Sequence, residues 1–209
     1  MNINDLWHSH DPILWNQTLD RYWFFVRPEN IELERSLNAL NLQRLKNLNP
    51  QSWYKFLRDE YFRWKYTTPN RYVTTTNQLR RYLDDDALDE LDNVRQRLLD
   101  LNPSETLTGL RTAKEVHGLG TAGASGLLSL MYPKHFATVD QFVVKALRQV
   151  DGLPEADALN QMNPEGLTLG NGILLISILT QKAIDNNLEF GTSIWTPRKI
   201  DMVLWTYGR

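Results

Sequence analysis

The sequence contains no cysteine, and this absence excludes several kinds of site. A disulfide scaffold, a thiolate zinc site, an iron–sulfur cluster held by cysteines and a cysteine nucleophile all need that residue. Long apolar runs are also missing, since the run at 172–179 is far too short to cross a bilayer. The first residues carry acids and histidines where a signal peptide has a basic start and an apolar run. We therefore expect a soluble, cytoplasmic protein that does not enter membranes.

Strand signals are almost absent, whereas apolar residues recur at helical spacing along the chain. Leucines predict one helix over about 29–48, and Asn49 with Pro50 predicts the start of another that reaches about 64. Further helix starts are expected near 84, 104, 121, 138, 164 and 197. The sequence therefore predicts an all-α fold of about eight to eleven helices.

Glycine is scarce, but four of the 11 glycines fall between 118 and 126, in the stretch HGLGTAGASGLL. This stretch joins two segments with helical spacing, 104–116 and 121–131. Gly118 and Gly120 give the turn backbone freedom, and the small residues that follow let two helices pack closely. The pattern predicts a helix–hairpin–helix in which Thr121 caps the second helix. An ordinary tight turn between two helices is the alternative interpretation.

A hairpin of this kind has the means to bind ions. Turn amides and a helix N-terminus form an anion site that suits a DNA phosphate. The carbonyls of the same turn are a candidate site for a monovalent cation.

Asp140 follows Gly120 by twenty residues and lies near the expected start of a helix. Thr138 and Gln141 have the spacing of a capping box, which places Asp140 in the first helical turn. A carboxylate held beside a pocket can stabilise a developing positive charge. Cleavage of a glycosidic bond produces such a charge on the sugar. A plain capping or first-turn role is the alternative for Asp140.

Residues 116–147, VHGLGTAGASGLLSLMYPKHFATVDQFVVKAL, resemble the signature of the helix–hairpin–helix base-excision DNA glycosylases. That superfamily includes endonuclease III, adenine glycosylase, 3-methyladenine glycosylase and the 8-oxoguanine glycosylases. Its pattern is a Leu-Pro-Gly-Val-Gly hairpin followed by a catalytic aspartate. Gly118 and Gly120 match the hairpin glycines, and Asp140 matches the aspartate at the family's spacing. The stretches FRWKYTTPNRY and TPRKIDMVLWTYGR are similar to an 8-oxoguanine-glycosylase-like bacterial group.

The resemblance implies two interleaved helical subdomains, about 75–150 and about 1–74 plus 151–209, with the active site in the cleft between them. It implies a DNA glycosylase that removes a damaged or modified base from double-stranded DNA, with Asp140 as the catalytic residue. Bifunctional members carry a lysine two residues after the last hairpin glycine, and here that position is Ala122.

None of the nearby lysines takes the place of the missing one in the sequence pattern. Lys114, Lys134 and Lys145 all lie at other positions. The resemblance therefore implies a monofunctional glycosylase, in which water attacks the sugar, and it gives no support to lyase activity. His117 also departs from the pattern, because the family commonly has proline there.

A basic aromatic segment supplies further expected contacts. Residues 53–82 hold nine aromatic side chains, and seven Lys or Arg against two acids. Basic groups neutralise phosphates and flat rings stack on an extruded base, although such residues also form ordinary cores and solvated faces. The predicted DNA contacts are Arg63 and Lys65 together with the hairpin residues His117, Gly118, Leu119, Gly120, Thr121 and Ala122. The predicted base-pocket residues are Trp64, Tyr66 and Trp205.

Two other functions stay open at this stage. One is a non-catalytic DNA- or protein-binding protein that uses the hairpin, and the other is an unrelated all-α enzyme whose hairpin is coincidental. His8, His10 and Asp11 are of metal-ligand type but have no partner motif, so we interpret them as a polar tail. We expect a monomer without a metal site.

Overall fold

The computed structural model describes all 209 residues, and every regular element in it is a helix, which confirms the all-α class. No helix combines the length and the hydropathy that a membrane-spanning segment needs. In chain order the elements are α1 (Ile3–Trp7), α2 (Pro12–Phe25), the 3-10 helix η1 (Pro28–Asn30), α3 (Ile31–Asn38), α4 (Leu42–Lys46), α5 (Pro50–Lys55), the π-helix η2 (Phe56–Phe62), α6 (Arg63–Lys65), α7 (Pro69–Asp84), α8 (Leu88–Leu99), α9 (Thr106–Lys114), α10 (Thr121–Met131), α11 (Gln141–Leu147), α12 (Ala156–Gln161), α13 (Leu169–Phe190) and α14 (Pro197–Gly208).

The chain has more helices than the sequence predicted, in part because the segment expected as one helix over 29–48 is broken. It forms η1, α3 and α4, with Leu40 and Asn41 outside any helix. The Asn41 side chain accepts a hydrogen bond from the backbone N–H of Gln43 at 2.8 Å and so starts a new helix. The leucine spacing continues across this turn, which is why the break was not predicted.

Capping residues set two other helix starts where the sequence placed them. Asn49 accepts a hydrogen bond from the N–H of Ser52 at 2.8 Å, and Pro50 is the first residue of α5. Thr196 accepts one from the N–H of Lys199 at 3.3 Å at the start of α14. A proline in the first turn loses no helical hydrogen bond, because its missing N–H would have had no partner there.

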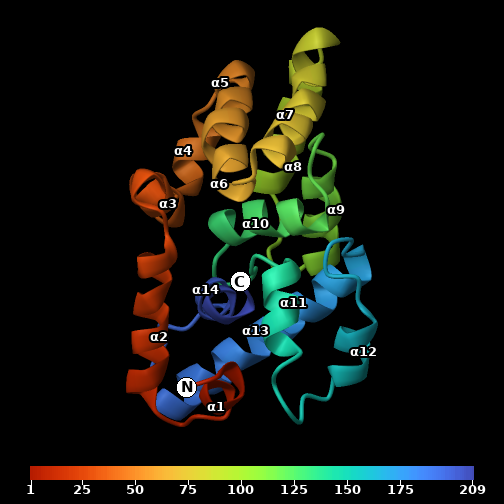
Figure 1. Cartoon of the computed structure of the whole chain (residues 1–209). Coiled ribbons are helices and arrows are strands. Elements are labelled where there is room, and N and C mark those ends of the chain that lie inside the picture. The colour runs from red at the N-terminus through yellow and green to blue at the C-terminus, as the bar shows by residue number, and fades with distance from the viewer.

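Helix α14 lies at the centre of the molecule, and α2, α11 and α13 pack around it (Figure 1). Most of α14 is buried, including the apolar side chains of Ile200, Val203 and Leu204. Near its end, Gly208 lies directly against the backbone of Phe142, and a β-carbon at Gly208 would overlap the Phe142 carbonyl. This close approach fixes the end of α14 against the start of α11.

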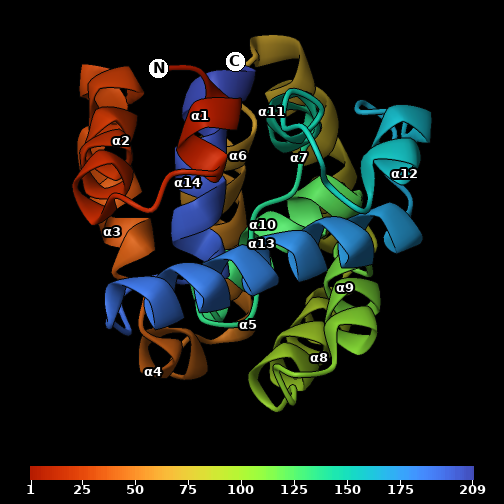
Figure 2. The same cartoon turned by 90° about the horizontal axis from the view of Figure 1, so that it is seen from below.

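Helices α9 and α10 form the predicted hairpin, within two residues of the expected bounds. Every residue of α10 from Gly123 to Met131 is buried, which explains why this helix is rich in small and apolar residues instead of amphipathic. Viewed from below, α13 crosses the molecule under α10 (Figure 2). A β-carbon at Gly172 of α13 would come within 2.6 Å of the Thr121 methyl group, so glycine permits this crossing.

One long helix runs from Pro50 to Lys65, and its middle part, η2, is π-helical. Hydrogen bonds from residue i to i+5 widen a π-helical turn and rotate the residues that follow it. The aromatic side chains of η2 are buried, while the three residues of α6 after it are at least partly exposed. Turns of this kind are rare and are often found at functional sites.

The hydrophobic core is one continuous cluster of 45 buried residues. It contains side chains from both predicted subdomains, for example Trp15 and Leu128. The division into 75–150 and the remainder therefore stays a prediction.

Candidate active site

A cavity of about 400 Å³ is lined by four segments that are far apart in the sequence. Residues from the end of α2 to α3, from 64–67, from 138–143 and from α14 to the C-terminal residue contribute to it. Its volume lies in the range of about 300–1,000 Å³ that is typical of small-molecule sites. Seven of the lining residues are charged: Arg27, Glu34, Lys65, Asp140, Arg198, Asp201 and Arg209.

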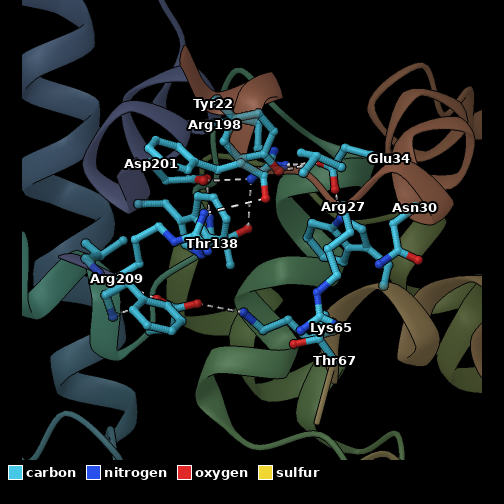
Figure 3. A pocket seen from close by; sticks show the side chains of 17 residues that line it. Tyr22, Arg27, Asn30, Glu34, Lys65, Thr67, Thr138, Arg198, Asp201 and Arg209 are labelled. Atoms are coloured by element: carbon cyan, nitrogen blue, oxygen red, sulfur yellow. Dashed lines mark hydrogen bonds and ion pairs between the residues drawn. The ribbon is translucent and has the colours of Figure 1, made fainter. Parts of the chain in front are cut away.

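Asp140 stands on this cavity as the N-cap of α11. Its Oδ1 accepts hydrogen bonds from the backbone N–H groups of Phe142 at 3.0 Å and Val143 at 3.5 Å. Its Oδ2 accepts one from the Lys65 Nζ at 3.0 Å, drawn as a dashed line in Figure 3. Both carboxylate oxygens therefore have fixed partners, while the side chain keeps 18% of its surface exposed.

The predicted capping box of Thr138 and Gln141 is wrong, because Asp140 itself takes the extended N-cap conformation. The Thr138 hydroxyl instead makes hydrogen bonds of 2.9 Å with Ser129 and 3.4 Å with Arg198. Its backbone N–H donates to Asp201 at 2.7 Å. Thr138 thus joins the cavity wall to α10 and α14.

The hairpin helix is bonded directly to the segment that carries Asp140. The Ser125 hydroxyl of α10 accepts a hydrogen bond from the N–H of Val139 at 3.0 Å, and Ser129 contacts Thr138. The two features that the sequence linked by spacing, the glycine-rich hairpin and the aspartate, are therefore held side by side. Close packing along α10 makes this arrangement possible.

Lys65 enters the cavity from α6, and its side chain is only 9% exposed. The stem passes over α10, where a β-carbon at Gly126 would lie 3.5 Å from the lysine Cδ and 2.8 Å from the Tyr61 hydroxyl. At Gly123 a β-carbon would likewise meet the Tyr66 hydroxyl. The small residues of α10 thus make room for the segment 61–66. Lys65 was predicted to contact DNA because of its charge within an aromatic segment, and its contact with Asp140 was not predicted.

A buried network of charges forms another wall of the cavity (Figure 3). Arg198 pairs with Asp201 at 2.6 Å and with Glu34 at 3.2 Å. Glu34 also accepts hydrogen bonds from the Tyr22 hydroxyl at 2.6 Å and from the Trp64 indole N–H. Burial raises the pKa of Asp201 to about 7, and the positive charge of Arg198 opposes that rise.

Aromatic side chains complete the cavity. Trp205 lies edge-on to Tyr22 and Phe142, with ring centroids 5.4 and 6.2 Å apart. The Arg209 guanidinium lies 4.6 Å from the Trp205 ring centroid, a distance typical of cation–π contacts. Arg27 is exposed at the cavity, and neither of these two arginines has an acidic partner within 4.0 Å.

At the hairpin turn, Gly118 takes a positive φ that glycine allows, whereas Gly120 takes an ordinary extended conformation. Gly118 has φ +94°, and a β-carbon there would come within 2.7 Å of the Thr75 carbonyl oxygen. At Gly120 a β-carbon would meet nothing within 4 Å, so the approach to this residue is open. Gly120, not Thr121, is the N-cap of α10, and no side chain caps this end. The first amides of α10 are therefore free of side-chain partners.

The side chains of the turn face the protein more than the predicted DNA contacts suggest. The His117 ring stacks on Tyr82 with centroids 4.2 Å apart. Leu119 and Thr121 are buried, and the Thr121 hydroxyl has no hydrogen-bond partner. Ala122 is half-buried. The turn thus presents backbone rather than side chains.

The remaining predicted residues divide between the cavity and its surroundings. Trp64, Lys65 and Trp205 line the cavity together with Asp140. Tyr66 does not line it, since its hydroxyl donates to the Gly118 carbonyl at 3.2 Å and supports the turn. The Gly118 carbonyl oxygen was one of the expected ligands of a monovalent cation at the turn. Because it already accepts a hydrogen bond from Tyr66, fewer carbonyl oxygens of the turn are free to bind a cation. Arg63 is exposed and lies outside the cavity.

The members of the buried network, Glu34, Arg198 and Asp201, were not predicted from the sequence. Glu34 stands three residues before the buried Leu37, on the apolar face of α3. An acidic residue on an apolar helix face was the one sequence feature that could have indicated a buried ion pair. Arg198 and Asp201 lie three residues apart in α14, in a stretch quoted only for its resemblance. Away from the cavity, the His8 Nε2 donates a hydrogen bond to the Asp151 carbonyl oxygen at 3.0 Å, and His10 pairs with Glu189.

No protein-family model matches this chain, and neither the curated proteins nor the solved structures searched contain a match to it.

Proposed function

We propose that this chain is a DNA glycosylase, which cleaves the N-glycosidic bond of a damaged or modified nucleotide in double-stranded DNA. One observation carries the proposal: the Asp140 carboxylate is fixed at a helix start and borders a cavity of about 400 Å³ with aromatic walls. A base inside a duplex becomes accessible only after it is turned out of the stack into such a pocket. The resemblance of residues 116–147 to the family signature assigns Asp140 the same role.

The geometry supplies the groups that this reaction needs. Positive charge develops on the deoxyribose as the bond to the base breaks, and a carboxylate at that point stabilises it. Trp64 and Trp205 line the cavity and are the proposed stacking partners of an extruded base. With Ala122 at the family's lysine position, the resemblance implies water as the nucleophile, and a free base and an abasic site as products.

The DNA backbone is expected to bind at the hairpin and at the exposed arginines. The uncapped start of α10 has free amides, and the open face of Gly120 lets a phosphate approach them. Arg27 and Arg209, which have no acidic partners, add positive charge beside the cavity. Duplex binding is therefore expected to weaken as salt rises.

The alternative is a non-catalytic DNA- or protein-binding protein that keeps the hairpin alone. One observation favours it, because the Lys65 ion pair occupies the carboxylate oxygen on which the chemistry depends. An open cavity with aromatic walls favours the enzyme, because a binding-only protein has no need of it. We therefore place the enzyme first.

Release of free base from a panel of damaged duplexes tests the proposal, with wild type compared with Asp140→Asn. Asparagine is also a good N-cap, so this change keeps the start of α11 while removing the charge. Base release is expected to fall by about 100-fold or more while DNA is still bound. Asp157→Asn, an exposed acid of α12, is the matched control and should keep full activity. Base release that survives in Asp140→Asn would refute the assignment.

A further inference from the structure

We infer that Lys65 is the nucleophile of this site, so that the protein forms a covalent imine with the sugar and cuts the DNA strand after it removes the base. The inference rests on the proposed function. It departs from the family pattern, in which the amine comes from the helix after the hairpin, where this chain has Ala122. It also replaces the water that the sequence alone predicted.

Position is the first reason. Lys65 is the only lysine among the residues that line the cavity, although the chain has eight lysines. Its Nζ lies 3.0 Å from the Asp140 Oδ2, so any sugar placed against that carboxylate is also within reach of the amine. In Figure 3 the Lys65 side chain extends across the cavity toward the Asp140 carboxylate.

The second reason is the local structure that brings the lysine there. The π-helical η2 widens the helix just before α6 and rotates the residues that follow. The lysine stem then crosses α10 at Gly126, where a larger residue would collide with the Tyr61 hydroxyl. The amine therefore comes to Asp140 over the same hairpin helix that carries Ala122, but from a different segment.

The chemistry needs no reagent other than water. The Asp140 Oδ2 accepts a proton from Lys65, which leaves a neutral amine with a free electron pair. The amine attacks C1′ of the deoxyribose as the bond from C1′ to the base breaks, and the departing base takes that bond's electron pair and the proton on Asp140. The bond from C1′ to the ring oxygen O4′ then opens, O4′ takes a proton from the new ammonium group, and a protonated imine remains.

Strand cleavage follows from that imine. The Asp140 carboxylate removes a proton from C2′, a double bond forms between C2′ and C3′, and the 3′-phosphate leaves with the electron pair of its bond to C3′. Water then hydrolyses the imine and restores the lysine. A lysine that only anchors Asp140 through charge would support none of these covalent steps.

Borohydride trapping separates the two roles. A duplex with a single abasic site is incubated with the full chain and sodium borohydride, which reduces an imine to a stable protein–DNA adduct. Lys65→Arg keeps the positive charge beside Asp140 but removes the nucleophilic amine. Lys145→Arg is the matched control, since Lys145 is exposed on α11 and lies 5.7 Å from the ring of the cavity residue Phe142.

Wild type and Lys145→Arg are expected to give the adduct, and peptide mapping of the wild-type adduct should locate it on Lys65. Lys65→Arg should give at least about 100-fold less, the scale of losing one positioned catalytic group. An adduct that maps to another amine, an undiminished adduct in Lys65→Arg, or no adduct from wild type bound to the duplex would overturn the inference. Peptide mapping of the wild-type adduct shows whether Lys65 is the nucleophile even if the Lys65→Arg variant folds poorly.

The proposed function is judged separately by release of free base. Base release from a damaged duplex without any trapped adduct would overturn the role of Lys65 and leave a glycosylase that uses water. An adduct on Lys65 without base release from any lesion would support the amine and overturn only the glycosylase.

Discussion

Two regions are hydrogen bonded to the short segment that carries Asp140, and they are built in different ways. The hairpin of α9 and α10 joins it through Ser125 and depends on neighbouring groups that approach closely at glycines. The buried network joins it through Asp201 and depends on charges that come from distant parts of the chain. The hairpin owes its geometry to glycines, which have no side chain and so allow close packing. The network owes its geometry to buried ion pairs that are shielded from water.

The difference predicts how each region fails when it is changed. One added β-carbon can distort a glycine turn, but the loss in free energy of unfolding is limited to the local strain of that residue. A buried charge left without its partner keeps its full desolvation cost. The network should therefore be the more fragile of the two regions.

The largest effect is expected for Arg198→Met, which leaves Glu34 and Asp201 buried without their positive partner. Removing one member of a buried ion pair typically costs about 3–5 kcal/mol of unfolding free energy. Denaturant unfolding followed by circular dichroism measures it. Arg97→Met, which breaks the exposed pair with Glu115, is the control and should cost no more than about 1 kcal/mol. A loss of no more than about 1 kcal/mol in Arg198→Met would show that the network adds little to stability.

Gly118→Ala is expected to destabilise the protein by about 1–3 kcal/mol. The added carbon meets both the positive φ of +94° and the Thr75 carbonyl oxygen at 2.7 Å. Gly152→Ala separates the two causes, because Gly152 also has a positive φ, +74°, but open space around it. The same unfolding measurement applies. If both variants lose equal stability, the approach to Thr75 does not help to fix the turn.

Gly120→Ala tests the function of the hairpin without disturbing its fold. A β-carbon at Gly120 meets nothing within 4 Å, and its φ of −81° suits any residue, so stability should not change. If a phosphate approaches the free amides of α10 at this point, the methyl group should weaken duplex binding by about tenfold, the scale of one charge-assisted hydrogen bond. Fluorescence anisotropy with a labelled duplex measures the change. Unaltered affinity would mean that the DNA backbone does not approach the turn at Gly120.

The two regions also differ in how far the sequence could predict them. The two helices and the glycine turn between them were predicted, because turn glycines act over a few residues, but the predicted cap Thr121 was wrong. Asp140 was correctly placed near a helix start, but Thr138, Asp140 and Gln141 are all residue types found in caps, and only the backbone conformation shows that Asp140 is the cap.

The network could not be predicted, because Glu34 and Arg198 are 164 residues apart and nothing local in either segment indicates the other. Lys65 was chosen for its charge in an aromatic segment, and its contact with Asp140 depends on a π-helical turn that has no sequence signature here. Local sequence patterns therefore predict the helices and the turn that surround the site. Which charged side chains pair with one another depends on the tertiary fold.

A further expected effect is a dependence of stability on pH that comes from Asp201. Its pKa in the folded protein is raised by burial to about 7, above the ordinary 3.8, so the folded state holds a proton that the unfolded state has released between these values. The contribution to stability is therefore complete below about pH 4 and is lost as the pH rises through about 7. Asp201→Asn cannot release that proton.

Unfolding curves of wild type and Asp201→Asn at pH 5 and pH 8 measure this contribution. Wild type should lose more stability between the two conditions than the variant, because only wild type acquires a buried negative charge there. The difference is expected to arise below about pH 7, since the pKa of about 7 already includes the opposing positive charge of Arg198 at 2.6 Å. Parallel pH profiles would show that Asp201 stays ionised between pH 5 and pH 8. Asp201 and Arg198 would then form a buried ion pair in which both groups are charged at both pH values.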